Sequence, residues 1–240
     1  MDGPLAATVA DGGHPFYPLG VSIPGYAANT MSALVLVLIF AAGCGAIFVP
    51  TWLVASRARR DISRCELLVT FWFVLCGFIH LFFEDAMIRY FSYHHLDMAS
   101  KMDLFGQLWK EYSLSDSRYM TRDPFVVCME TITAVFWGPL SFFCAYAVVA
   151  RHPLRHPVQL IVSLGQLYGD VLYYAICLFN EHVYGIAYSR PERFYYWAYF
   201  VLCNAFWIAI PLLLMAQSLR ESAAAFARGP RANGSVKKSQ

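Results

Sequence analysis

The chain has 240 residues, of which 58% are hydrophobic and only 14% are charged. A soluble domain carries about 25% charged residues, so this composition favours a single membrane domain. The formal net charge of +2 is small and scattered, and the sequence has no nucleic-acid motif, zinc-ligand spacing or glycine-rich phosphate loop.

The N-terminal segment, residues 1–30, precedes the first apolar run and contains no lysine or arginine. Proline and glycine are frequent between Gly12 and Ala27, which disfavours a regular helix or strand. We expect this segment to pack as an irregular lid or tail on the lumenal side of a membrane.

Five apolar runs follow, each close to the ~20 residues that a helix needs to cross a bilayer. The first is apolar throughout and contains Pro50, so it is predicted to be a kinked structural anchor. The sequence therefore predicts an all-α integral membrane protein, in which residues 31–219 form a bundle of five transmembrane helices with an intramembrane cavity. The predicted spans are about 31–55, 66–90, 125–149, 157–180 and 195–219.

Basic residues predict the orientation of these helices. They are concentrated after the first run, after the third run and in the tail, residues 220–240. With five spans these segments lie on one side, which the positive-inside rule makes cytosolic. The N-terminus and the loops 91–124 and 181–194 are then lumenal. The basic residues are Arg57, Arg59, Arg60, Arg64, Arg151, Arg155, Arg220, Arg228, Arg231, Lys237 and Lys238.

The predicted cytosolic tail carries a candidate targeting signal. Lys237 and Lys238 have the spacing of the dilysine signal that retrieves membrane proteins to the endoplasmic reticulum, which is an address read by a receptor. The alternative interpretation is a basic disordered tail. The sequon that begins at Asn233 should stay without a glycan if the tail is cytosolic.

Three ionisable residues interrupt the second and third runs. His80 and Glu84 are four residues apart on one helix face, and Glu130 lies in the third run. An ionisable group at the centre of a membrane helix costs roughly 2.5–3.5 kcal/mol on insertion scales, so it is usually retained for function. The competing interpretations are that the histidine bonds a carbonyl group, and that Glu84 and Asp85 extend to the membrane interface.

Polar and aromatic side chains are also paired at helical spacing. Glu130 and Thr133 are three residues apart, and so are Asn204 and Trp207 in the fifth run. Depth can be counted from the lumenal ends of the predicted spans at a rise of about 1.5 Å per residue. Both glutamates then lie roughly 8 Å deep, and His80 and Asn204 both lie roughly 15 Å deep. We therefore predict that three helices direct these groups into a common interior. The alternatives are a threonine that bonds within its own helix and a tryptophan that only packs.

The fourth run carries a polar stripe of its own. Gln159, Ser163, Gln166 and Asp170 follow the spacing of one helix face. Hydrogen bonding between helices is one explanation, and it applies most readily to Gln159 and Ser163 near the cytosolic end. Gln166 and Asp170 lie nearer the depth of the predicted interior site. We expect them to contact the site residues without contacting the substrate.

Two carboxyl groups, an imidazole, an amide and an indole suit acid–base chemistry on an apolar substrate. One carboxyl group can give a proton to one carbon while the other takes a proton from a second carbon. The face of an indole such as that of Trp207 stabilises a cation between the two steps. A cavity open to the bilayer excludes the water that would trap this cation.

The residues around these groups form long motifs, which occur in order along most of the chain. They are His14–Pro18, Cys76–Leu81 with Glu84, Leu108–Tyr112, Asp116–Tyr119, Cys128–Ala134, Trp137–Pro139, Gly165–Tyr173 and Asn204–Trp207. Together they resemble the emopamil-binding protein family.

The resemblance implies a 3β-hydroxysteroid Δ8→Δ7 isomerase of the endoplasmic reticulum membrane, acting in late sterol biosynthesis without a cofactor or metal. Such enzymes protonate C9, pass through a C8 carbocation and lose a proton from C7. We expect the two glutamates and the histidine to handle protons, and the other residues to orient the reacting groups and stabilise the cation. By similarity, the functional residues are His80, Glu84, Glu130, Thr133, Asn204 and Trp207.

The loop between the second and third runs has two interpretations. Tyr112, Arg118 and Tyr119 either cap the cavity or bind the 3-hydroxyl group of the sterol. Alternatively they belong to a structural clasp in which Lys110 pairs with Asp116, an ion pair that contributes little at a surface.

The resemblance also implies binding of cationic amphiphilic amines, because an ammonium ion between carboxylates and an indole mimics the carbocation. The expected partners are therefore a sterol, such amines and membrane lipid, and small residues such as Ala42, Gly43 and Gly45 are compatible with a homodimer. Two other functions stay open. One is a non-catalytic sterol or amine receptor or carrier, and the other is a proton-coupled transporter, which the lack of a detectable internal repeat disfavours.

Overall fold

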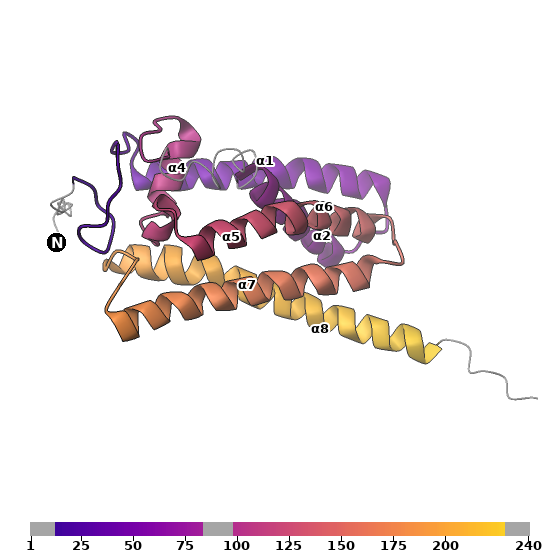
Figure 1. The fold of residues 1–240 in the computed structure, drawn as a ribbon. Helices are drawn as coiled ribbons and strands as arrows, with labels where there is room; N and C mark the ends of the chain where they lie inside the picture. The colour runs from indigo at the N-terminus through magenta and orange to yellow at the C-terminus, as the bar shows by residue number, and fades with distance from the viewer. Residues whose placement is uncertain (1–12, 84–97, 229–240) are drawn as a thin grey trace, which may run out of the picture.

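The computed structural model describes residues 13–83 and 98–228, and within these ranges the regular structure is entirely helical. This part of the chain includes five helices long and apolar enough to cross a membrane, which confirms the predicted bundle (Figure 1). The predicted second span reaches about residue 90, and its last residues lie outside the described part. The observed spans are Ala33–Ala58, Arg64–Leu81, Pro124–Val149, Arg155–Tyr184 and Phe194–Arg228.

Helix α1 (Ala33–Ala58) is a peripheral anchor, as its uniformly apolar sequence predicted. Ser32 caps it by accepting a hydrogen bond from the backbone N–H of Val35 at 3.4 Å. Only Leu36 and Ala55 of this helix are buried. Its other apolar side chains are left to face lipid, and the helix packs on the bundle through α2.

Three of the remaining four spans combine α-helices with wider π-helical segments. Helix α8 runs to Arg228, beyond the predicted end near residue 219. The second span consists of α2 (Arg64–Phe78) and η1 (Ile79–Phe83), the third of α5 (Pro124–Ile132), η3 (Thr133–Trp137) and α6 (Gly138–Val149), the fourth of α7 (Arg155–Tyr184), and the fifth of η4 (Phe194–Cys203) and α8 (Asn204–Arg228).

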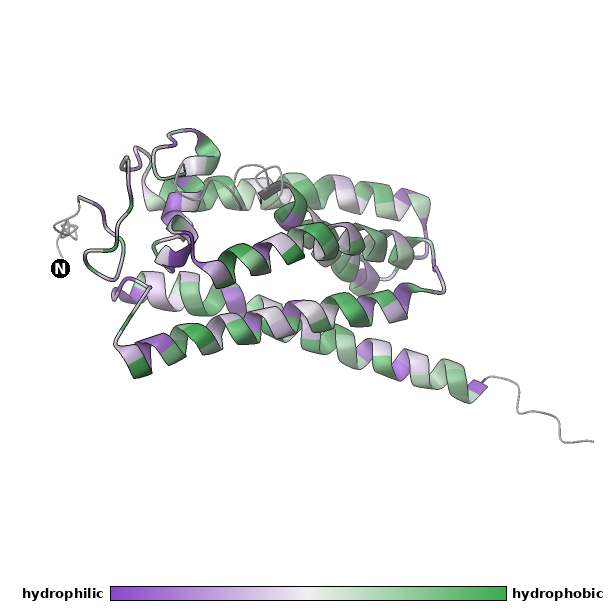
Figure 2. Cartoon of the chain, viewed as in Figure 1, coloured by the Kyte–Doolittle hydropathy of each residue, from purple (hydrophilic) through white to green (hydrophobic). Residues whose placement is uncertain are grey.

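The bundle is built on two helix pairs, α7 with α8 and α2 with α6. In Figure 1, α7 and α8 cross, and the C-terminal part of α8 extends beyond the other helices. Hydrophobic residues run along all the spans in Figure 2, whereas polar residues are more frequent near the helix ends. A short helix, α4 (Leu104–Tyr112), lies at one end of the bundle, which we call the α4 end.

The described part of the N-terminal segment, residues 13–32, is irregular and packs at the α4 end, as its proline and glycine content predicted. Gln107 of α4 holds it there. The Gln107 Oε1 atom accepts hydrogen bonds from the backbone N–H groups of Thr30 at 2.9 Å and Met31 at 3.0 Å. Lys110 donates from Nζ to the carbonyl oxygen of Ala27 at 2.6 Å. The segment is therefore a fixed part of the fold.

An ion-pair cluster closes the opposite end of the bundle. Glu66 Oε2 lies 2.6 Å from Arg59 Nη2, and Glu66 Oε1 lies 2.9 Å from Arg155 Nη1. Arg59 also donates to the carbonyl oxygen of Val148 at 2.9 Å. The Glu66 carboxylate of α2 thus binds Arg59 at the end of α1 and Arg155 of α7, and Arg59 in turn bonds the end of α6.

Replacing Glu66 by alanine should lower the free energy of unfolding by about 2 kcal/mol, because it leaves two largely buried guanidinium groups without their shared partner. The control is Arg151→Gln, which removes an ion pair to Asp61 in which both side chains are more than 60% exposed. That change should cost less than about 0.5 kcal/mol. Thermal unfolding in detergent measures both, and equal losses would contradict this role of Glu66.

Candidate active site

Three of the five spans change from α-helix to π-helix at the level of the predicted site. His80 lies in η1, Thr133 is the first residue of η3, and Asn204 directly follows η4. A π-helical turn fits one extra residue into the helix and is frequent at functional sites. The sequence pattern predicted continuous α-helices here, so the local change in helix type is a new finding.

Side chains bond the backbone around two of these π-helical segments. Thr133 Oγ1 donates to the carbonyl oxygen of Met129 at 2.8 Å, and Asn204 Nδ2 donates to that of Phe200 at 2.7 Å. Tyr174 of α7 donates from its hydroxyl group to the carbonyl oxygen of Val201 at 2.7 Å. Thr133 therefore bonds within its own helix, which was the alternative interpretation of this residue. The oxygen of this hydroxyl group can still accept a hydrogen bond.

His80 is buried, with 4% of its surface exposed. A Cβ atom on Gly138 would lie 3.4 Å from His80 Cβ and 2.7 Å from Leu81 Cγ, so only glycine allows η1 to approach α6 this closely. His80 also lies within electrostatic range of Glu130. Its Nε2 atom is 3.4 Å from Nε2 of Gln166 on α7. The second, third and fourth spans thus meet around this imidazole.

The approach of α7 to the third span depends on Gly165. A Cβ atom at this position would lie 2.3 Å from Cζ2 of Trp137. Gly165→Ala should therefore displace the indole and lower the free energy of unfolding by about 1–3 kcal/mol. Gly169→Ala, one turn along the same helix, meets only Met129 Sδ at 3.9 Å and should be neutral or stabilising by up to about 1 kcal/mol. Thermal unfolding of both variants checks this difference, and equal effects would contradict it.

Trp207 of α8 packs against a second indole. Its ring centroid lies 5.2 Å from that of Trp72, at an interplanar angle of 57°. Trp72 is buried, and it lies eight residues before His80, or about 12 Å along the helix. The fifth span thus places Trp207 against a buried ring about two helical turns from His80 in the second span. Glu84 lies outside the described residues.

Tyr112 connects α4 to this site. The side chain of Asn204 is its hydrogen-bonding partner, and Glu130 is among the charged groups near it. Burial raises the pKa of Tyr112 well above its usual value, so the hydroxyl group stays protonated. Its ring also contacts that of Tyr119, with centroids 5.5 Å apart.

The predicted pairing of Lys110 with Asp116 is wrong. Lys110 bonds Ala27 of the N-terminal segment, whereas Asp116 accepts from Arg118 Nη2 at 2.7 Å. The Asp116 carboxylate also caps the short helix η2 (Ser117–Met120), which places it beside Arg118. The Arg118 guanidinium lies 5.1 Å from the ring centroid of Tyr173. Arg118 and Asp116 thus form a buried clasp, with side chains 1% and 0% exposed.

The polar stripe of α7 faces the bundle along its whole length, because all four of its residues are buried. Gln159 donates to the carbonyl oxygen of Leu214 at 3.1 Å and to Gln217 Oε1 at 3.0 Å, which confirms the predicted bonding between helices for this residue. Ser163 Oγ is buried without a hydrogen-bonding partner among the described residues, so the same prediction is wrong for Ser163. Gln166 contacts His80. The Asp170 Oδ2 atom is buried without a hydrogen-bonding partner.

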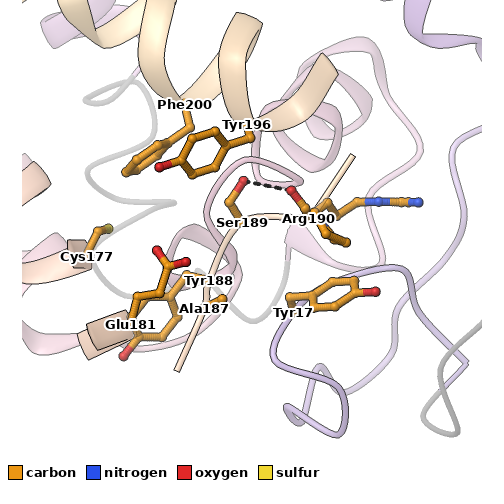
Figure 3. A pocket seen from close by; sticks show the side chains of 10 residues that line it. Tyr17, Cys177, Glu181, Ala187, Tyr188, Ser189, Arg190, Tyr196 and Phe200 are labelled. Atoms are coloured by element: carbon orange, nitrogen blue, oxygen red, sulfur yellow. Dashed lines mark hydrogen bonds between the residues drawn. The ribbon is translucent and has the colours of Figure 1, made fainter. Parts of the chain in front are cut away.

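A separate pocket opens at the α4 end, between the C-terminal part of α7, the connection to η4 and Tyr17 (Figure 3). Its wall includes Glu181, Arg190 and the buried residues Cys177 and Phe200. No sequence pattern predicted this pocket, because its residues come from separate segments without a shared motif. Among residues 13–83 and 98–228, no cluster of three His, Cys, Asp or Glu side chains is placed to bind a metal ion.

Apolar helices around a buried imidazole, carboxyl and amide group define a multi-pass membrane protein with an ionisable site inside the bundle. Comparisons with known proteins give the family. Residues 104–218 match the family model described as EBP, of the EXPERA (expanded EBP) superfamily. The chain belongs to this family.

Curated relatives extend the match over most of the chain. The mouse (Mus musculus) 3-beta-hydroxysteroid-Delta(8),Delta(7)-isomerase is 38% identical over 209 residues, which cover 86% of this chain and 87% of the mouse protein. The probable isomerase of the same name from rice (Oryza sativa subsp. japonica) is 31% identical over 89% of this chain and 94% of its own. The protoglabretal synthase MOI1 of Citrus sinensis is 32% identical over 70% of this chain and 75% of its own.

Proposed function

We propose that this chain is a sterol Δ8→Δ7 isomerase that acts without a cofactor. The names of the mouse and rice relatives support this reaction, since each aligns with nearly the whole chain. The observation that carries the proposal is the meeting of His80, Glu130 and Gln166 inside apolar helices. The sterol is the substrate.

The reaction is a balanced transfer of protons. A carboxylic acid gives its proton to C9, and the electron pair of the C8–C9 double bond forms the new C9–H bond. This leaves a cation at C8. A base then takes a proton from C7, and the electrons of that C–H bond form the C7–C8 double bond. The sterol is isomerised with no net gain or loss of atoms or electrons.

We assign Glu130 and Glu84 as the proton-handling carboxyl groups, with His80 passing protons between them. Thr133 and Asn204 orient the carboxyl groups or the sterol. Trp207 stabilises the C8 cation with its π face. Exclusion of water by the surrounding apolar side chains keeps the cation from being trapped. Tyr112 is assigned as a supporting group, because its hydroxyl group reaches Asn204.

The proposal extends to ligands, assembly and location. Cationic amphiphilic amines should bind the same site, because an ammonium ion resembles the C8 cation.

A homodimer could form through α1, where a Cβ atom on Gly43 or Gly45 would meet no atom within 4 Å. We place the protein in the endoplasmic reticulum membrane on the basis of its family and of the dilysine pair. The distribution of arginine and lysine predicts that the N-terminus lies in the lumen and the C-terminus in the cytosol. The dilysine pair and the sequon lie outside the described residues.

Incubation of the purified, reconstituted protein with a Δ8 sterol tests the proposed reaction. The expected product is the Δ7 isomer, identified by gas chromatography with mass spectrometry. Binding of the sterol without conversion would favour the receptor or carrier function instead. Proton flux across proteoliposomes, without sterol conversion, would favour a transporter.

A further inference from the structure

Gln166 contacts His80 through an amide whose second polar atom has no partner. The two side chains are 5% and 4% exposed, and their Nε2 atoms lie 3.4 Å apart. The Oε1 atom of Gln166 is buried and accepts no hydrogen bond. A buried carbonyl oxygen without a donor is unfavourable. Gln159 Oε1 is also buried without a donor among the described residues, so what distinguishes Gln166 is its contact with His80.

In the amide orientation that the structure gives, this contact indicates which ring nitrogen of His80 carries the proton. An amide nitrogen can only donate, so the facing Nε2 atom of His80 must accept. A neutral histidine that accepts at Nε2 carries its proton on Nδ1. The contact therefore selects the neutral Nδ1–H tautomer. A doubly protonated imidazolium would place an N–H group against the amide NH2 group, and neither could accept.

We propose that Gln166 is a positioning residue that sets the tautomer of His80, and that its amide turns over when His80 becomes doubly protonated. This role rests on the proposed isomerase function. A turn of about 180° exchanges the NH2 group for the carbonyl oxygen in nearly the same volume. Because Oε1 has no hydrogen bond to lose, this turn breaks no bond on the oxygen side.

The proposed reaction explains why the Gln166 amide would need to turn. Before the next turnover the base must lose the proton taken from C7 and the acid must regain a proton, and these protons exchange with solvent. If His80 carries one of these protons, it alternates between the neutral form and the imidazolium. An amide can match both forms, whereas leucine can match neither and a carboxylate only a ring that is protonated at Nε2.

The same helix provides a matched control. Gln159 lies two turns away on the same face, is completely buried, and bonds α8 instead of His80. We expect Gln166→Leu to lower kcat about 10–100-fold with KM changed less than threefold, as for other groups that orient a reacting histidine. Gln159→Leu should lower Tm and leave kcat within about twofold of the wild type.

A second measurement does not depend on turnover. ¹⁵N NMR of histidine-labelled protein, with His80→Asn used for assignment, separates protonated from unprotonated ring nitrogens. We expect unprotonated Nε2 in the wild type and protonated Nε2 in Gln166→Glu. A protonated Nε2 in the wild type, or unchanged kcat in Gln166→Leu, would overturn the proposed role. If the wild-type protein does not convert a Δ8 sterol, the isomerase proposal fails separately, and the NMR spectra still decide the tautomer.

Discussion

Glu130→Gln should fold as the wild type does and lose about 10³-fold in turnover of a Δ8 sterol. Glutamine has nearly the shape of glutamate and can still form hydrogen bonds, but it cannot release or accept a proton at neutral pH. Proton transfer by a positioned acid or base typically contributes 10²–10⁴-fold, and two steps of the proposed reaction depend on it. Initial rates with a Δ8 sterol, together with Tm in detergent, measure the effect.

The matched control for this change is Glu181→Gln. Glu181 is an exposed residue of α7 beside the separate pocket at the α4 end, remote from the proposed chemistry. Its variant should retain wild-type turnover. A folded Glu130→Gln protein with wild-type turnover would rule out Glu130 as a proton-handling group.

Trp207→Ala should weaken the binding of an amphiphilic amine by about 30-fold, which corresponds to about 2 kcal/mol. The proposed cause is loss of the indole face that contacts the ammonium group. Trp207→Phe keeps an aromatic face and should lose only a few-fold. Displacement of a radiolabelled amine from reconstituted protein measures the affinities.

Trp197 gives the corresponding control in the same span. Its side chain is 61% exposed, so Trp197→Ala should leave amine affinity unchanged. If Trp207→Ala bound the amine as tightly as the wild type, the indole would have only the packing role that its contact with Trp72 supplies. The same variants should rank identically in turnover, since the amine and the C8 cation are proposed to use one site.

The positions of the spans could be predicted from sequence because hydropathy depends only on composition within a window. The α1 anchor was predicted correctly because its run is apolar throughout. The polar face of the fourth run correctly predicted that Gln159 bonds another helix, but it did not identify that helix as α8. The π-helical segments at His80, Thr133 and Asn204 could not be predicted. A change in the backbone hydrogen-bond ladder leaves no distinctive composition, and a regular α-helix was the natural expectation.

Contacts between distant segments were harder to predict. Lys110 and Asp116 have complementary charges at short separation, yet each has a better partner once the chain folds. Lys110 reaches a carbonyl oxygen of the N-terminal segment, and Arg118 matches Asp116 with two of its nitrogens. Gly138 allows the helix segment that carries His80 to pack closely, because a side chain at this position would collide with Leu81. The sequence alone does not show this contact.

The most direct test of the proposed chemistry is turnover of a Δ8 sterol in D₂O, followed by mass spectrometry and NMR of the product. The isomerase mechanism predicts a Δ7 sterol carrying a single deuterium at C9, because the acidic proton of the site exchanges with solvent before transfer. A Δ7 product without deuterium at C9 would contradict protonation by a solvent-exchanged carboxyl group. Unchanged sterol, bound to folded protein, would contradict the isomerase function itself.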